Sequence, residues 1–318
     1  MSSRKLADTL VERYDLTPPV DVLALLEGVA DVEHLVWEQS VDGLVLGLSH
    51  PGRPRAFLRM NQPSRRKRFT AAHEWGHISI PWHTESLESC HIDNSAYSAL
   101  GVREREANEF ASRVLMPDRY MKRLVTESLN VADWLQGVAY CDVSAHAGLI
   151  SLVDYLPSGY TFALHQGDAL SPKLFRSSGT PIVLSGGRKP VESLVASSFR
   201  SGKIDLNGKQ VWWFQHIDTS LPPRGSASSA QLLAEIVSRY GRELRPGRPT
   251  DKAINSVIGG KLGRRDRMSL GQMLGVLKLH MQSDPDLQPL LADPTFEELL
   301  LVRVYEIAEK DKANGRSQ

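Results

Sequence analysis

The residues with the clearest chemical potential are the five of His73-Glu74-Trp75-Gly76-His77. The flanking residues predict a helix, in which positions four apart share a face, so both histidines can direct their imidazoles at one metal ion. Glu74 can reach a water molecule at that metal and take its proton. Two ligands, a base and a helix that fixes them form the core of a zinc hydrolase. The alternative is a purely structural role, in which two core histidines are hydrogen-bonded to backbone carbonyls. The glutamate between them makes this structural role less favourable than metal binding.

The helix around this motif is expected to begin at Ser64 as its N-cap and to end at Pro81. Apolar or small residues recur beside the two histidines at three-and-four spacing: Phe69, Ala72, Gly76 and Ile80. The pattern predicts one packed face, on which the small side chains leave room for close packing or for a metal.

A catalytic zinc usually has a third protein ligand, and the sequence offers three candidates. His83 stands at the metzincin spacing, but the tight turn of that pattern needs a glycine where this chain has Ile80. Glu104, on a second predicted helix over 104–117, is preferred because such a helix commonly completes this motif. Glu106, about 160° around the helix from Glu104, is the next candidate.

Further polar residues could support such a site. Asn108 lies one turn after Glu104 and can hydrogen-bond a metal ligand. A peptidase also needs a group that stabilises the oxyanion of the attacked carbonyl. The candidates, each of which fits a structural or surface role better, are His83, His91, Tyr97 and Tyr120.

These two segments together resemble the ImmA/IrrE family of zinc metallopeptidases. The first is RFTAAHEWGH, from Arg68 to His77, and the second is Glu104-x-x-Ala107-Asn108-x-Phe110-Ala111-x-x-Val114-Leu115-Met116-Pro117. The resemblance covers roughly residues 1–155. It implies a gluzincin-like fold, with zinc on His73, His77 and Glu104 and with Glu74 as the general base. Trp75 departs slightly from the family, where an aliphatic residue is also common.

The resemblance also implies a function. The best-understood members of the family cut a helix-turn-helix repressor and thereby switch on genes, so the implied partner is a DNA-binding repressor that receives a limited, regulated cut. Two other functions stay open. One is a non-catalytic regulatory binding module with a structural zinc site, in which Glu74 would have no use. The other is a metal hydrolase of a non-peptide substrate.

Composition limits the remaining classes of function. The chain has 318 residues, of which 41% are hydrophobic and 24% charged, as in an ordinary globular protein. A net charge of +1 gives no general reason to bind nucleic acid or acidic membranes, and the basic run 65–68 is expected to be a solvated face or to hold nearby carboxylates. Two cysteines and the absence of a signal-peptide pattern or a long apolar run favour a cytoplasmic protein without a membrane span.

The expected fold class is α+β. A zincin-like metallopeptidase domain (1–156) is followed by a mixed α/β sensor-like or docking domain (157–246) and a helical C-terminal region (247–318). A strand near the site should offer its edge to an extended peptide. The expected helices are 3–14, 18–28, 145–156, 229–240, 268–282 and 294–311, and the expected strands are 44–48, 56–60, 160–165, 181–184 and a hairpin over 204–214 that turns at Asn207-Gly208, with a linker at 219–229.

Overall fold

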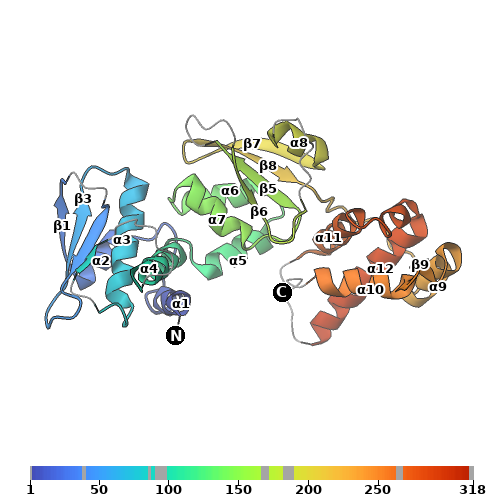
Figure 1. The fold of residues 1–318 in the computed structure, drawn as a ribbon, viewed down its shortest axis with the longest axis horizontal. Helices are drawn as coiled ribbons and strands as arrows, with labels where there is room; N and C mark the ends of the chain where they lie inside the picture. The colour runs from blue at the N-terminus through green and yellow to red at the C-terminus, as the bar shows by residue number, and fades with distance from the viewer. Residues whose placement is uncertain are drawn as a thin grey trace. The chain divides into compact units, whose positions relative to one another are not determined.

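The computed structural model describes residues 2–37, 41–84, 87–89, 99–165, 172–181, 190–262 and 268–314. They form two compact units. Unit 1 comprises 1–152 with 206–208, and unit 2 comprises 153–205 with 209–318. Both units combine helices with a small sheet, so the expected α+β class is confirmed (Figure 1). The finer division at residues 156 and 246 stays a prediction.

Unit 1 contains both helices that carry the sequence motifs. Its helices are α1 (Ser3–Arg13), α2 (Val22–Val29), α3 (Ser64–Ser79), α4 (Ala99–Leu115), α5 (Asp118–Glu127), α6 (Val131–Tyr140) and α7 (Ala145–Val153). Its strands are β1 (Asp31–Leu35), β2 (Gly43–Leu46), β3 (Arg55–Arg59) and β4 (Leu87–Ser89). The two expected strands thus correspond to β2 and β3, and the expected first helix to α1.

The sheet of unit 1 has the order β1-β3-β2-β4. Strand β2 runs antiparallel to both of its neighbours, whereas β1 is parallel to β3, with Asp31 opposite Arg55. Sequence analysis did not predict β1 or its pairing. Among the described strands the edges of this sheet are β1 and β4, and β4 pairs with Leu44–Leu46 of β2.

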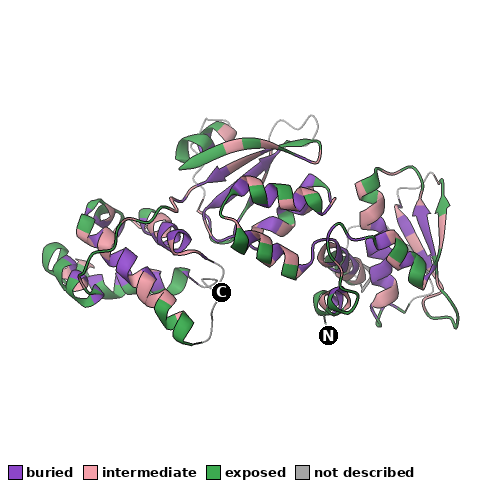
Figure 2. Ribbon diagram, turned by 180° about the vertical axis from the view of Figure 1, so that it is seen from behind, coloured by how far each residue is buried: buried purple, intermediate pink, exposed green. Residues whose placement is uncertain are grey.

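Helix α3 is the central helix of unit 1 and lies beside this sheet (Figure 1). Every residue from Thr70 to His77 is buried, so the helix is covered on all sides there (Figure 2). Its start differs from the expectation: Pro63 is the N-cap, and no side chain caps the helix. The ring of Pro63 fixes φ at −56°, and Ser64 already has helical geometry, so its hydroxyl does not take the capping position.

The basic run at the start of α3 bonds to carboxylates within unit 1. Arg65 Nε lies 2.9 Å from Asp142 Oδ1, and Arg68 Nε lies 3.3 Å from Asp142 Oδ2. Arg66 Nε donates to Asp42 Oδ2 over 2.6 Å. These pairs agree with the expectation that the run holds nearby carboxylates, and they attach the segment that precedes β2 to α3.

Unit 2 contains a second four-stranded sheet, of order β6-β5-β8-β7. The strands are β5 (Tyr160–Leu164), β6 (Lys173–Arg176), β7 (Arg200–Leu206) and β8 (Lys209–Gln215), and α8 (Pro190–Ser197) packs beside β8. The expected hairpin is confirmed, since Asn207 and Gly208 turn with φ of 56° and 81°. Val211 and Phe214, on opposite faces of β8, are both fully buried, as expected for a strand covered on both sides.

The C-terminal part of unit 2 is mainly helical. It contains α9 (Ser229–Tyr240), the short strands β9 (Glu243–Arg245) and β10 (Arg248–Pro249), α10 (Thr250–Lys261), α11 (Leu270–Gln282), the 3₁₀ helix η2 (Gln288–Ala292) and α12 (Pro294–Ala313). Irregular backbone over 216–228 matches the expected linker, and α9 has the expected bounds. Sequence analysis missed α8, α10 and β6, and the strand expected at 181–184 falls mostly outside the described residues.

Among the helices that the structure describes, none has both the length and the apolar run that crossing a bilayer requires.

Candidate metal centre

Three of the residues selected from the sequence converge between α3 and α4. The Nε2 atoms of His73 and His77 lie 3.0 Å apart. Each is 3.3 Å from an oxygen of Glu104, Oε2 for His73 and Oε1 for His77. Donor atoms around one tetrahedral zinc ion lie about 3.4 Å from one another, given bonds of about 2.0–2.1 Å. The triangle of donor atoms therefore has the size that such an ion needs.

The approach of α4 to α3 depends on a small residue. A Cβ on Gly76 would lie 3.0 Å from Phe110 Cδ1 and 3.4 Å from Ala107 Cα, so glycine lets the two helices approach closely. Trp75 packs edge-on against Phe110, with ring centroids 5.3 Å apart. Phe110 and Ala107 are themselves fully buried. This packing places the preceding turn of α4, which carries Glu104, opposite the two histidines.

The protonation of these groups follows from their burial and from one another. Burial lowers the pKa of His77 to about 4, so its ring is neutral at pH 7. Burial alone would raise the pKa of Glu104, but the adjoining imidazoles outweigh it and lower the pKa to about 2. For His73 burial acts downward, yet Glu104 and Glu74 outweigh it and raise the pKa. The cluster therefore attracts positive charge, which a metal ion would supply.

One carboxylate oxygen of this cluster, Oε1 of Glu104, is available to bind a cation. Glu104 Oε1 is buried and accepts no hydrogen bond of acceptable geometry from the residues that the structure describes. A buried carboxylate oxygen in that condition is costly unless a cation binds it. Together with the spacing of the three donor atoms, this orphaned oxygen indicates that the residues present fit a divalent metal.

Glu74 is fully buried, and its carboxylate lies against the start of β2. A Cβ on Gly43 would be 2.2 Å from Glu74 Oε1 and 2.6 Å from Thr70 Cγ2, so only glycine leaves room for this carboxylate. Gly43 pairs with Leu58 of β3, and the neighbouring Asp42 bonds to Arg66 of α3. Sequence analysis gave no role to Gly43, since its close approach to α3 comes from the pairing of distant segments.

The remaining candidates lie around the cluster rather than in it. His73 Nδ1 is 3.0 Å from Asn108 Oδ1, the contact that the sequence predicted for a residue one turn after Glu104. His83 does not join the three donor atoms, because its Nδ1 lies 3.0 Å from Nδ1 of His77, on the far side of that ring. Glu106 is likewise outside the group and contacts His83 Nε2 at 3.1 Å.

Of the other oxyanion candidates, Tyr120 lies within the described residues. His91 and Tyr97 lie outside the described residues. The hydroxyl of Tyr120 donates to the carbonyl oxygen of Gly137 over 3.0 Å, which joins α5 to α6. Burial raises the pKa of Tyr120 to about 12, so the hydroxyl keeps its proton.

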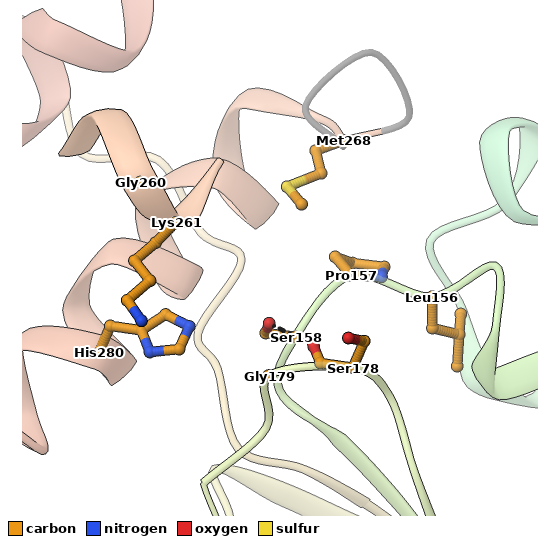
Figure 3. Close-up of a pocket in the computed structure, with 9 residues that line it drawn as sticks. All are labelled: Leu156, Pro157, Ser158, Ser178, Gly179, Gly260, Lys261, Met268 and His280. Carbon is orange, nitrogen blue, oxygen red and sulfur yellow. Dashed lines mark hydrogen bonds between the residues drawn. The ribbon is translucent and has the colours of Figure 1, made fainter. Parts of the chain in front are cut away.

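Unit 2 has a pocket of a different kind, with a volume of about 270 Å³. Figure 3 shows Lys261 and His280 on one side of it and the hydroxyls of Ser158 and Ser178 on the other. Burial and the nearby charge of Lys261 lower the pKa of His280. Among the described residues that line this pocket there is no carboxylate and a single histidine, so it lacks the glutamate base and the two-histidine, one-glutamate donor set of the first site.

Comparison with known proteins agrees with the geometry of unit 1. Residues 33–146, a little over a third of the chain, match the family model described as the IrrE N-terminal-like domain, a peptidase family. The matched range includes both α3 and α4, and its mixture of helices with one small sheet fits a zincin-like fold. A search of curated proteins gave no match. The part of the chain that holds the His73–His77–Glu104 cluster therefore lies within a match to a peptidase family, in agreement with the resemblance of the two motifs to the ImmA/IrrE family.

Proposed function

We propose that this chain is a zinc-dependent endopeptidase. The observation that carries the proposal is the convergence of His73, His77 and Glu104 within 4.8 Å of one another, next to the buried carboxylate of Glu74. Two imidazoles and one carboxylate are the donor set of many catalytic zinc sites, in which a fourth position stays open for water or substrate. The match to a peptidase family supports the reaction class.

The residues of the chain have separate tasks in this reaction. Zinc, when bound, supplies a Lewis acid that polarises a carbonyl and eases the deprotonation of water. Glu74 takes a proton from the attacking water and passes it to the departing amine. Asn108 accepts a hydrogen bond from Nδ1 of His73, which keeps the Nε2 lone pair of that ring directed at the cluster. Gly43 leaves the space in which the Glu74 carboxylate lies.

The substrate would bind as an extended segment along β4. Among the described strands β4 is an edge of its sheet, and its partner β2 begins at Gly43, against Glu74. An edge strand presents unpaired backbone groups, to which an extended peptide can add as a further strand. This arrangement suits the cutting of a flexible segment in a folded protein.

The substrate that we propose is a helix-turn-helix transcriptional repressor, which would receive one limited, regulated cut in the cytoplasm. This choice rests on the family of residues 33–146. The net charge of +1 gives the chain itself little reason to bind DNA, so contact with the regulated gene would be made by the repressor.

The proposal can be tested by labelling new protein N-termini in cells that express either the wild-type chain or the Glu74→Gln variant. We expect a few new N-termini that depend on Glu74, at least one of them in a DNA-binding repressor. The purified zinc-loaded protein should then cut that repressor at the same bond, and a chelator should stop the cut.

Two results would overturn the proposal. If no new N-terminus depends on Glu74, but the variant retains the regulatory effect in cells, the chain acts as a binding module. If the purified protein hydrolyses small-molecule esters or amides and leaves every protein intact, it is a hydrolase of another class.

A further inference from the structure

A line of polar contacts extends from His77 away from the cluster. His77 Nδ1 is 3.0 Å from His83 Nδ1, and His83 Nε2 is 3.1 Å from Glu106 Oε2. The indole of Trp82 donates to the same oxygen of Glu106 over 2.7 Å. His83 is only 3% exposed, and neither it nor Glu106 belongs to the three-residue donor set. The mechanism described above uses none of these contacts.

The directions of these hydrogen bonds follow from the chemistry of the groups. An ionised carboxylate only accepts, so His83 must donate from Nε2 to Glu106. A neutral His83 then has a lone pair at Nδ1, which can only accept from Nδ1 of His77. His77 therefore carries its proton on Nδ1 and presents the lone pair of Nε2 to His73 and Glu104. With this assignment each contact in the line has one donor and one acceptor.

The opposite assignment of donors and acceptors is incompatible with the carboxylate of Glu106. If His83 donated from Nδ1 to His77, the lone pair of His83 Nε2 would face the carboxylate at 3.1 Å. The proton of His77 would then lie on Nε2, inside the cluster, where it would exclude a metal. Trp82 agrees with the first assignment, because its N–H is a second donor to the same oxygen of Glu106.

We propose that His83 and Glu106 are positioning residues that hold His77 in the tautomer and orientation required for metal binding. This inference rests on the proposed function and goes beyond it. Helix α4 then has two tasks. It supplies Glu104 to the cluster, and it supplies Asn108 and Glu106, which orient the two histidine rings. Asn108 fixes His73 directly, and Glu106 fixes His77 through His83.

The first test is a chelator-competition titration with zinc, on the full chain. Partners of metal-bound histidines typically change metal affinity about 10- to 100-fold, so we expect Glu106→Gln to weaken zinc binding within that range. Glu109→Gln is the matched control: Glu109 is on the same helix and contacts Ser3 and Arg4 instead. It should bind zinc as the wild type does.

A second pair of variants separates hydrogen bonding from packing. His83→Gln retains an acceptor for Nδ1 of His77, whereas His83→Leu fills similar space without one. We expect the glutamine variant to bind zinc several-fold more tightly than the leucine variant. NMR of the zinc-loaded wild type, with ¹⁵N-labelled histidine, should show the proton of His77 on Nδ1. A role in packing alone would change thermal stability and would leave this tautomer and the zinc affinity of the folded protein unchanged.

The outcomes distinguish this inference from the proposed function. A wild-type protein that binds no zinc would overturn the proposed function itself. A wild type that binds one zinc, with Glu106→Gln within about twofold of it, would overturn the positioning role alone. If His83→Leu does not fold, the comparison of Glu106→Gln with Glu109→Gln still decides.

Discussion

Two polar clusters, one in each unit, combine carboxylates with nitrogen-bearing side chains but differ in how their charges are paired. In unit 1, His73, His77 and Glu104 direct two ring nitrogens and two carboxylate oxygens at one another across 3.0–3.3 Å. In unit 2, Arg248 lies between two carboxylates: its Nη2 is 2.5 Å from Asp284 Oδ2, and its Nη1 donates to Asp286. The second cluster pairs its own charges, whereas the first presents acceptors that a cation from outside would join.

The difference separates a binding site from a structural ion pair. The guanidinium of Arg248 donates to both aspartates, so the charges of that cluster are paired within the chain. Glu104 Oε1, in contrast, is buried and accepts no hydrogen bond from the described residues. We infer that the unit 1 cluster gains stability and activity from a metal, and that the unit 2 cluster contributes stability alone. Four predictions, from the largest effect to the smallest, test this contrast.

The largest effect is expected from Glu74→Gln. The amide cannot take a proton from water, so cleavage of the proposed repressor substrate should slow by about 10³-fold, within the range typical of a lost general base. Zinc content should not change, since Glu74 is outside the donor set. Cleavage rates and metal analysis of the same preparation measure both quantities. Zinc lost together with activity would mean that Glu74 is a ligand.

The second effect concerns the space in which Glu74 lies. In Gly43→Ala the new methyl group would meet Glu74 Oε1 at 2.2 Å, so the carboxylate must move. A displacement of about 1 Å in a reacting group can cost about 100-fold in rate, so we expect a loss of that size with zinc retained. Gly28→Ala in α2, where a Cβ has no neighbour within 4 Å, is the control. A Gly43→Ala protein with wild-type activity would show that Glu74 is not the general base of the reaction.

The third prediction compares the two units in one experiment. Zinc at about 100 times its dissociation constant should stabilise unit 1 against opening by about 2.7 kcal/mol. Hydrogen exchange should therefore slow in α3 and α4 and stay unchanged in α11 of unit 2. A chelator should reverse the change. If zinc slowed hydrogen exchange equally in both units, or in neither, the proposed difference between the two clusters would be wrong.

The smallest effect is expected from Arg248→Ala. The pair is partly exposed, so the loss should be about 1 kcal/mol of the stability of unit 2, with zinc binding unchanged. Hydrogen bonding from Arg248 lowers the pKa of Asp284 below its usual 3.8. This stabilisation is therefore present above pH 3.8 and is lost as the pH falls through the lower pKa of the folded state. Denaturant unfolding of wild type and variant at pH 7 and pH 3 measures the difference, which should shrink at pH 3.

The parts of the site that sequence could predict are those set by local periodicity. His73 and His77 are four apart on one helix, and Glu104 and Asn108 are four apart on another, so each pair shares a face wherever the helices lie. Helix α9 and the turn at Asn207-Gly208 were predictable for the same reason: their residues determine backbone geometry over a few positions.

The parts that sequence did not predict depend on contacts between distant segments. Strand β1 pairs with β3 in parallel, more than twenty residues along the chain, and no local pattern specifies that partner. The same holds for Gly43 against Glu74 and for His83 between His77 and Glu106. The spacing of His83 from the motif favours a role as a metal ligand. Its residue type marked it as relevant, but only the fold shows which nitrogen faces which neighbour.

The central claim is that the unit 1 cluster binds one zinc ion through His73, His77 and Glu104. The direct measurement is the zinc content of the purified wild-type chain beside His73→Ala, Glu104→Ala and Arg248→Ala. We predict one zinc per chain in the wild type and in Arg248→Ala, and none in the other two variants. A wild type without zinc, or a Glu104→Ala variant that keeps its zinc, would contradict the assignment of the cluster as the metal site.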